Sequence, residues 1–283
     1  MRKIISLLVI FVMTYSISAE DSYPSENESP EVIHLLLEAG YDINDHPNYM
    51  LYKSPWEELI RLDAPLPFFE KMLVLGKNIE PDFANGINES PLVMAIQKNN
   101  YEVVDFLIKS GANVNRLHRR QRTPIYHAAR DADFRILELL IKAGADVNRT
   151  DEGGYTPLHT VFSQFGERNH KEKIEVLLAN QANINAVTSD GLTPLMQSVS
   201  TFMSQAEVVQ TLLSGRPNIN AVNSEGQSAL IIAAANVDDP AIISLLLNAG
   251  ADARLEDNTG RTALDWFDLN KRINRSPVRM ELF

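Results

Sequence analysis

The stretch TPIYHAARDADFRILELLIKAGADVN, residues 123–148, contains the signals for two consecutive helices. Thr123 stands before Pro124, so its hydroxyl is placed to accept from the first free N–H groups of a helix, and proline at the first helical position loses no needed donor. A helix is therefore expected to begin at Pro124. After a short polar turn, the apolar period of residues 136–141 predicts a second helix, and Gly144 is expected to close it in the left-handed conformation.

Both ends of this stretch recur along the chain. The Ser/Thr phrase that starts the first helix begins at residues 54, 90, 123, 156, 193, 228 and 262, at intervals of 36, 33, 33, 37, 35 and 34 residues. The phrase around Gly144 recurs in step with it, at residues 39, 75, 110, 143, 180, 215 and 249. Such a fixed period predicts a stack of repeats, whose function is expected to lie on an extended surface.

This pattern resembles the ankyrin repeat, which residues 123–148 fit without a gap, and the resemblance extends from about residue 31 to the end. It implies an all-α solenoid of helix-turn-helix units joined by hairpin-like turns, with about seven to eight units including atypical caps. The units that begin at Thr156, Thr193 and Ser228 carry extra residues between their helices, which we interpret as loop insertions.

The first residues have the pattern of a secretory signal peptide. Arg2 and Lys3 precede an apolar run over residues 4–13, and small residues up to Ala19 are followed by an abrupt acidic switch. The alternative is a buried N-terminal helix or membrane anchor, although the run is short for a bilayer. We therefore expect a signal peptide at 1–19, a polar arm or linker at 20–30 and the repeat domain at 31–283.

Cysteine is absent, which rules out the acylated cysteine of a lipoprotein anchor. An exported repeat protein with a short leader is interpreted as a soluble bacterial periplasmic protein, with a eukaryotic secreted protein as the alternative. Without the leader, 24 basic and 37 acidic residues give a net charge of −13. This charge disfavours nucleic acid and anionic membranes and favours a protein partner with a basic face and some exposed carboxylates, unless the acids serve only solubility. The free protein is expected to be monomeric.

The sequence offers no recognisable catalytic chemistry. The six histidines show no metal-ligand spacing, and the common nucleophile, phosphate-binding and dinucleotide-binding motifs are missing. Asp131 and Asp133 are close in sequence, but they are interpreted as solvating the turn between two helices. We therefore expect no enzyme activity, no catalytic residue, no cofactor and no metal.

In the family that the chain resembles, partner contacts usually come from variable positions of the turn and the first helix. An arginine cluster stands out there, because arginine forks bind carboxylates and often anchor interfaces. The alternative is that these arginines pair with Asp131, Asp151 and Glu152 on their own surface. The expected partner-binding residues are Arg119, Arg120, Arg122, Arg130, Glu152, Tyr155, Gln164, Asp190, Leu192 and Glu225.

Three functions remain compatible with the sequence. The first is a periplasmic protein that binds and inhibits a partner, such as an immunity protein against an envelope-acting toxin. The second is an accessory protein that stabilises or escorts an exported enzyme. The third is a secreted host-directed effector or an enzyme, which would need a catalytic segment beyond the repeats. An exported acidic scaffold without chemistry of its own favours the first.

Overall fold

The computed structural model describes residues 56, 59–60, 63–74, 79, 89–163, 169–200, 205–270 and 278. The expected signal peptide, the linker and the first part of the repeat domain lie outside these residues. Within them the secondary structure is helical, apart from an isolated antiparallel bridge between Val222 and Ser228. No helix in the described ranges is both long and apolar enough to cross a bilayer.

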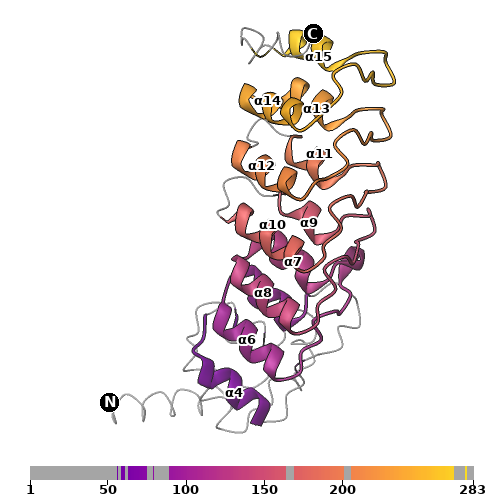
Figure 1. The fold of residues 1–283 in the computed structure, drawn as a ribbon. Helices are drawn as coiled ribbons and strands as arrows, with labels where there is room; N and C mark the ends of the chain where they lie inside the picture. Colours follow the sequence, from indigo (N-terminus) through magenta and orange to yellow (C-terminus); the bar gives the residue numbers. More distant parts are fainter. Residues whose placement is uncertain are drawn as a thin grey trace, which may run out of the picture.

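The helices form a stack of antiparallel pairs, as Figure 1 shows. First helices are α5, α7, α9, α11, α13 and α15, and second helices are α4, α6, α8, α10, α12 and α14. In chain order they are α4 (Leu66–Val74), α5 (Pro91–Gln97), α6 (Tyr101–Lys109), α7 (Pro124–Asp131), α8 (Phe134–Lys142), α9 (Pro157–Thr160), α10 (His170–Ala179), α11 (Pro194–Ser198), α12 (Ala206–Ser214), α13 (Ala229–Asn236), α14 (Pro240–Asn248) and α15 (Ala263–Leu269). A short 3-10 turn, η2 (Arg119–Gln121), precedes α7.

The first helices begin where the Ser/Thr phrase predicts, but the hydroxyl does not cap every one of them. Capping oxygens accept from the backbone N–H three residues on at Ser90, Thr193, Ser228 and Thr262. The hydroxyl of Thr156 instead bonds the Nδ1 atom of His159 at 2.8 Å. The hydroxyl of Thr123 is buried and has no hydrogen-bond partner among the described residues. The expected cap is therefore wrong at Thr123, although α7 still begins at Pro124.

The second helices end in a left-handed residue. Gly144 has φ +88°, as predicted, and Gly111 and Gly250 both have φ +94°. Gln181 and Arg216 occupy the same place in two other repeats with φ +66° and +55°. The phrase therefore requires a left-handed backbone conformation after the second helix. Glycine adopts this conformation most easily, and other residues adopt it at a cost in free energy.

The core lies between the two rows of helices and runs through the whole stack. The second helices from α6 to α14 each contribute a leucine with no exposed surface, at residues 107, 140, 177, 212 and 246, and α4 contributes the buried Met72. Each repeat packs on its neighbours, so the stack needs no single central core. At the C-terminal end, Phe267 is fully buried, and the indole Nε1 of Trp266 donates to Asp257 Oδ2 at 2.7 Å. This bond gives Trp266 a structural role.

The turn between α7 and α8 is held by Asp131 and Asp133. Asp131 accepts from the guanidinium of Arg130, and Asp133 caps α8 by accepting from the N–H of Arg135 at 3.0 Å. The interpretation that these carboxylates solvate the turn is therefore wrong, because one forms an ion pair and the other begins a helix. The pKa of Asp133 is lowered, against the opposing effect of its burial, by its hydrogen bonds from Arg135.

Candidate functional site

Among the described residues, five hairpin-like fingers connect the repeats, and Figure 1 shows them on one side of the stack. In each finger, the N–H of the first residue donates to the carbonyl of the last residue over 2.8 to 3.1 Å. We number them in chain order from the first to the fifth finger, and they comprise residues 118–122, 151–155, 188–192, 223–227 and 257–261. Neighbouring fingers are bonded to each other, as where the N–H of Glu152 donates to the Arg120 carbonyl at 3.0 Å.

The first finger has a different turn from the others. In the second finger, Asp151 Oδ1 accepts from the N–H groups of Gly153 and Tyr155, at 2.9 and 3.0 Å. His118 stands at the corresponding place in the first finger, and its ring Nε2 lies 3.3 Å from Ser90 Oγ instead. Without a carboxylate to organise the turn, Arg120 and Gln121 both adopt left-handed backbone angles, φ +60° and +58°. Such angles cost non-glycine residues about 1 kcal/mol or more each, so this finger stores strain.

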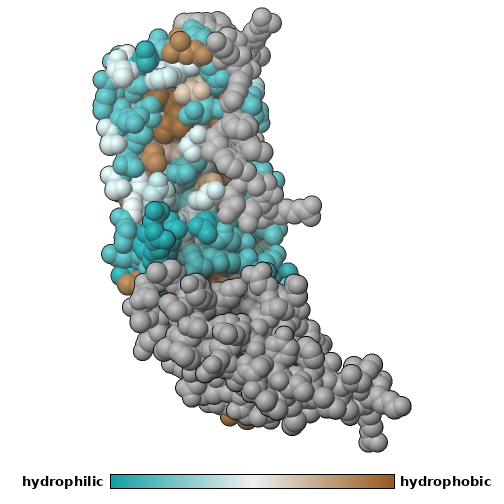
Figure 2. Space-filling model, turned by 180° about the vertical axis from the view of Figure 1, so that it is seen from behind, coloured by the Kyte–Doolittle hydropathy of each residue, from teal (hydrophilic) through white to brown (hydrophobic). Residues whose placement is uncertain are grey.

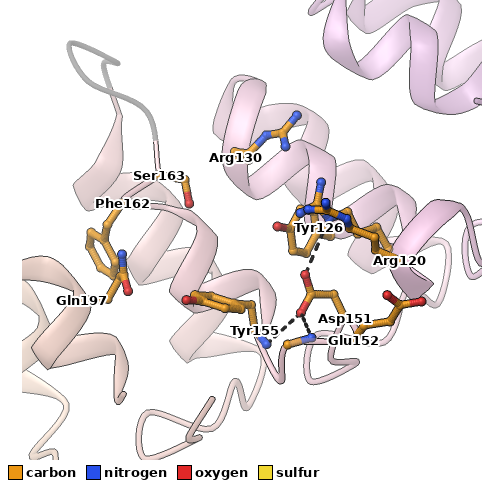
Figure 3. Close-up of a pocket in the computed structure, with 11 residues that line it drawn as sticks. Arg120, Tyr126, Arg130, Asp151, Glu152, Tyr155, Phe162, Ser163 and Gln197 are labelled. Carbon is orange, nitrogen blue, oxygen red and sulfur yellow. Dashed lines mark hydrogen bonds and ion pairs between the residues drawn. The ribbon is translucent and has the colours of Figure 1, made fainter. Parts of the chain in front are cut away.

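The first and second fingers, with α7 and α9, surround an open hollow of about 710 Å³ (Figure 3). Five of the expected partner-binding residues line it: Arg120, Arg122, Arg130, Glu152 and Tyr155. The lining is completed by Tyr126, Asp151, Gly153, Phe162, Ser163 and Gln197. The hollow therefore combines aromatic rings with charged groups of both signs.

Two of the arginines are held by carboxylates of the chain itself. The guanidinium of Arg122 lies 4.7 Å from the ring centroid of Tyr126, and its Nε lies 3.5 Å from Asp151 Oδ2. Arg130 makes a bidentate pair with Asp131, at 2.8 and 2.7 Å, which raises the pKa of its guanidinium. For Arg122 and Arg130 the structure therefore shows the alternative left open by the sequence, in which arginines pair with acids of their own surface.

Arg119 and Arg120 differ from these two. Both side chains are exposed at the tip of the first finger, and neither makes an ion pair within the part of the chain that the structure describes. A carboxylate of another molecule can bind these two guanidinium groups at the lowest cost in free energy, since no ion pair must first be broken.

The remaining expected residues lie away from the hollow. Asp190 and Leu192 belong to the third finger and Glu225 to the fourth, and Gln164 lies outside the described residues. Leu192 is half-buried against the core, and its carbonyl accepts from the ring of His159 at 3.0 Å. His159 thus links two repeats.

Tyr126 lines the site but is not among the residues expected from the sequence. Its ring lies between the guanidinium groups of Arg122 and Arg130, whose carbon atoms are 4.7 and 6.0 Å from its centroid. Burial raises the pKa of its hydroxyl. Comparing positions across repeats would have identified it, because the third residue after the helix-starting Ser or Thr faces the fingers at Tyr126 as it does at His159.

His127 is buried beside this hollow without taking part in it. Neither ring nitrogen has a hydrogen-bond partner among the described residues, and its ring centroid lies 6.4 Å from that of His118. Burial, together with the charge of Arg130, lowers the pKa of His127 to about 3, so the ring is neutral. The described residues contain no group of three or more His, Cys, Asp or Glu side chains arranged to hold a metal ion.

A family model described as ankyrin repeats in three copies matches residues 66–151, 134–222 and 199–267. The chain belongs to the ankyrin-repeat family. The crystal structure of the human ASB11 ankyrin repeat domain is similar to it, with a TM-score of 0.68 and 24% sequence identity over 81% of this chain and 96% of that chain. The expected all-α ankyrin solenoid is thereby confirmed, and ankyrin repeats indicate a protein-protein interaction module.

Proposed function

We propose that this ankyrin protein binds one partner protein across its finger and first-helix face and inhibits it, as an immunity protein neutralises an envelope-acting toxin. The observation that carries the proposal is the hollow beside Arg120 and Tyr155, where exposed guanidinium groups stand next to aromatic surface. Arginine and tyrosine are enriched among the residues that dominate binding energy at protein interfaces. The described residues supply a binding surface and no arranged catalytic group, so action by obstruction fits them best.

A second function is supported by the same surface. An accessory protein that escorts or stabilises an exported enzyme also needs a protein interface and no chemistry. The neighbouring gene distinguishes the two, since a toxin gene supports inhibition and a housekeeping enzyme supports escort. Adding the purified protein to the partner's activity assay distinguishes them directly, because an inhibitor lowers the initial rate and an escort prolongs the active lifetime. A host-directed effector or an enzyme has the least support.

The location that goes with this proposal is the periplasm. It rests on the basic, apolar and small-residue pattern of residues 1–19, which lie outside the described residues. Intact-mass measurement of protein from a periplasmic fraction should show loss of residues 1–19. Full-length protein found in the cytosol alone would contradict it.

The partner that we propose has a basic face and some exposed carboxylates, and the free ankyrin protein is monomeric. The net charge of −13 without residues 1–19 supports this, because it repels nucleic acid and anionic membranes and attracts basic surfaces. Size-exclusion chromatography with light scattering tests the monomer.

The deciding experiment is a pull-down with the mature protein from envelope extract, followed by titration calorimetry with the captured partner. Replacing Arg120→Glu and Tyr155→Ala together should weaken binding by at least about 2 kcal/mol, because a carboxylate of the partner then meets like charge and an aromatic contact is lost. Glu138→Lys on α8 is the control, and it should change affinity much less. A larger effect of the control than of the double variant would contradict the proposed face.

A further inference from the structure

We propose that the finger face is electrically polarised and accepts a protein partner of matching polarity: acidic at the first finger, apolar at the hollow, and basic at the third and fourth fingers. This inference rests on the proposed binding function and specifies the chemistry of its partner. It places the basic face and the exposed carboxylates of the proposed partner in a fixed order along the stack.

The polarity is already present in the sequence of the stack. Residues 89–149 contain ten basic and seven acidic side chains, whereas residues 150–270 contain six basic and fifteen acidic ones. Within residues 89–270 the charge therefore changes from a basic to an acidic excess. A partner that lies along these residues meets a field of different sign on the two sides of residue 150.

The fingers display this difference most clearly. The segment 116–122 carries four arginines and no acid. The second, third and fourth fingers contain no lysine or arginine, and the exposed acids near their tips are Glu152, Asp190 and Glu225. Figure 2 shows the face that carries the first helices, with hydrophilic residues gathered along the finger edge and an apolar patch in its upper half.

Hydrogen bonds between fingers fix the order of these charges in space. The N–H of Glu152 donates to the Arg120 carbonyl at 3.0 Å, and that of Ser224 donates to the Asp190 carbonyl at 2.9 Å. The N–H of Ser189 links the second and third fingers through the Gly153 carbonyl at 2.9 Å. The tips therefore stand in a bonded row, which fixes the order of their charges along the stack.

The hollow lies between the first and second fingers, where the charge of the finger tips changes from positive to negative. Its deeper charges are compensated, because Arg122 lies beside Asp151 and Arg130 is paired with Asp131. Tyr126 is buried, and the ring surface that a partner can reach there comes from the half-buried Tyr155 and Phe162 (Figure 3). Aromatic rings give a large contact area at low entropic cost, so the occupant that fits this position is an apolar or aromatic side chain.

The test uses synthetic peptides, so that it does not depend on knowing the natural partner. The block peptide carries a run of Glu, then Gly-Trp-Gly, then a run of Lys, about eleven residues that reach up to ~40 Å when extended. An alternating peptide has the same composition with Glu and Lys interleaved, and a third peptide has Lys in all charged positions. Binding is measured by fluorescence anisotropy with the full mature protein at low and high salt.

The block peptide should bind at least about tenfold more tightly than either other peptide at low salt, and the difference should shrink as salt screens the charges. The double variants Arg119→Glu/Arg120→Glu and Asp190→Lys/Glu225→Lys should each reduce this preference about fivefold or more. Lys142→Glu and Glu175→Lys, on the second helices, are the controls and should leave it unchanged. Circular dichroism verifies that each variant folds.

Equal binding of the block and alternating peptides would overturn the polarised face, and so would tighter binding of the all-Lys peptide. Neither result would touch the proposed inhibition, which depends on the captured partner and its activity. Conversely, a preference for the block peptide without any inhibited partner would leave the polarised face standing and remove the proposed function.

Discussion

Asn148 of one repeat is hydrogen-bonded to the main chain of the next repeat. Its Oδ1 accepts from the N–H of Asn183 at 2.7 Å, and its Nδ2 donates to the carbonyl of Gln181 at 3.0 Å. Asn115 and Asn220 make the same pair of contacts one repeat below and two repeats above. The asparagine that ends the recurring phrase is therefore a link between neighbours and not only the exit into a turn.

Replacing Asn148→Ala should lower the free energy of unfolding by about 1 to 3 kcal/mol, because two hydrogen bonds between repeats are lost together. The control is Asn180→Ala, which removes a single bond within α10, from Nδ2 to the Val176 carbonyl. Urea denaturation of both variants gives the comparison. Equal losses would mean that the link between repeats contributes no more than an ordinary bond inside a helix.

Gly144→Val should also destabilise the stack, by about 1 to 3 kcal/mol, because valine must adopt φ +88°. A Cβ atom placed on Gly144 would meet nothing within 4 Å, so the cost comes from the backbone alone. Ala143→Val is the matched control, since residue 143 has φ −82°. Thermal unfolding should show a clear drop for the first variant and a small change for the second.

Pro124, Gly144 and Asn148 show which structural features can be predicted from the sequence. The helix start at Pro124 and the left-handed Gly144 were predictable, because each depends on residues next to it in the chain. The bond from Asn148 to the next repeat was not, because its partners are about one repeat away. The same holds for the site: the exposed Arg120 and the half-buried Tyr155 follow from their place in the repeat, whereas the pairing of Arg122 with Asp151 joins two fingers.

Acidification should destabilise the protein through His127. The folded protein holds this ring neutral down to about pH 3, whereas an unfolded histidine takes up a proton below about pH 6.5. Between these values the unfolded state binds more protons, so stability falls as the pH falls. The loss from pH 7 to pH 5 should be about 2 kcal/mol, at 1.36 kcal/mol for each pH unit below 6.5.

The variant His127→Gln tests this assignment, because it removes the titrating group and keeps a polar side chain of similar length. Its stability at pH 7 is not the readout, since the substitution disturbs a buried position. The readout is the change in the urea midpoint between pH 7 and pH 5, which should be smaller in the variant than in the original protein. A part of the change should persist, because burial also lowers the pKa of His159. An undiminished change would assign the acid sensitivity to other groups.

Asp151 performs two tasks that substitution can separate. Its Oδ1 organises the second finger by accepting from two backbone N–H groups, and its Oδ2 lies beside the buried Nε of Arg122. Asp151→Asn keeps an oxygen in the place of Oδ1 but removes the charge and puts an NH2 donor in the place of Oδ2, so it should cost about 1 kcal/mol. Asp151→Ala removes both carboxylate oxygens and should cost about 2 to 3 kcal/mol, because the turn donors and the arginine are then left without partners.

Urea denaturation measures the cost of each substitution, and the backbone amide chemical shifts of Gly153 and Tyr155 report whether the turn is kept. If Asn and Ala prove equally costly with the turn shifts unchanged, the charge opposite Arg122, and not the turn, is what Asp151 contributes to this finger.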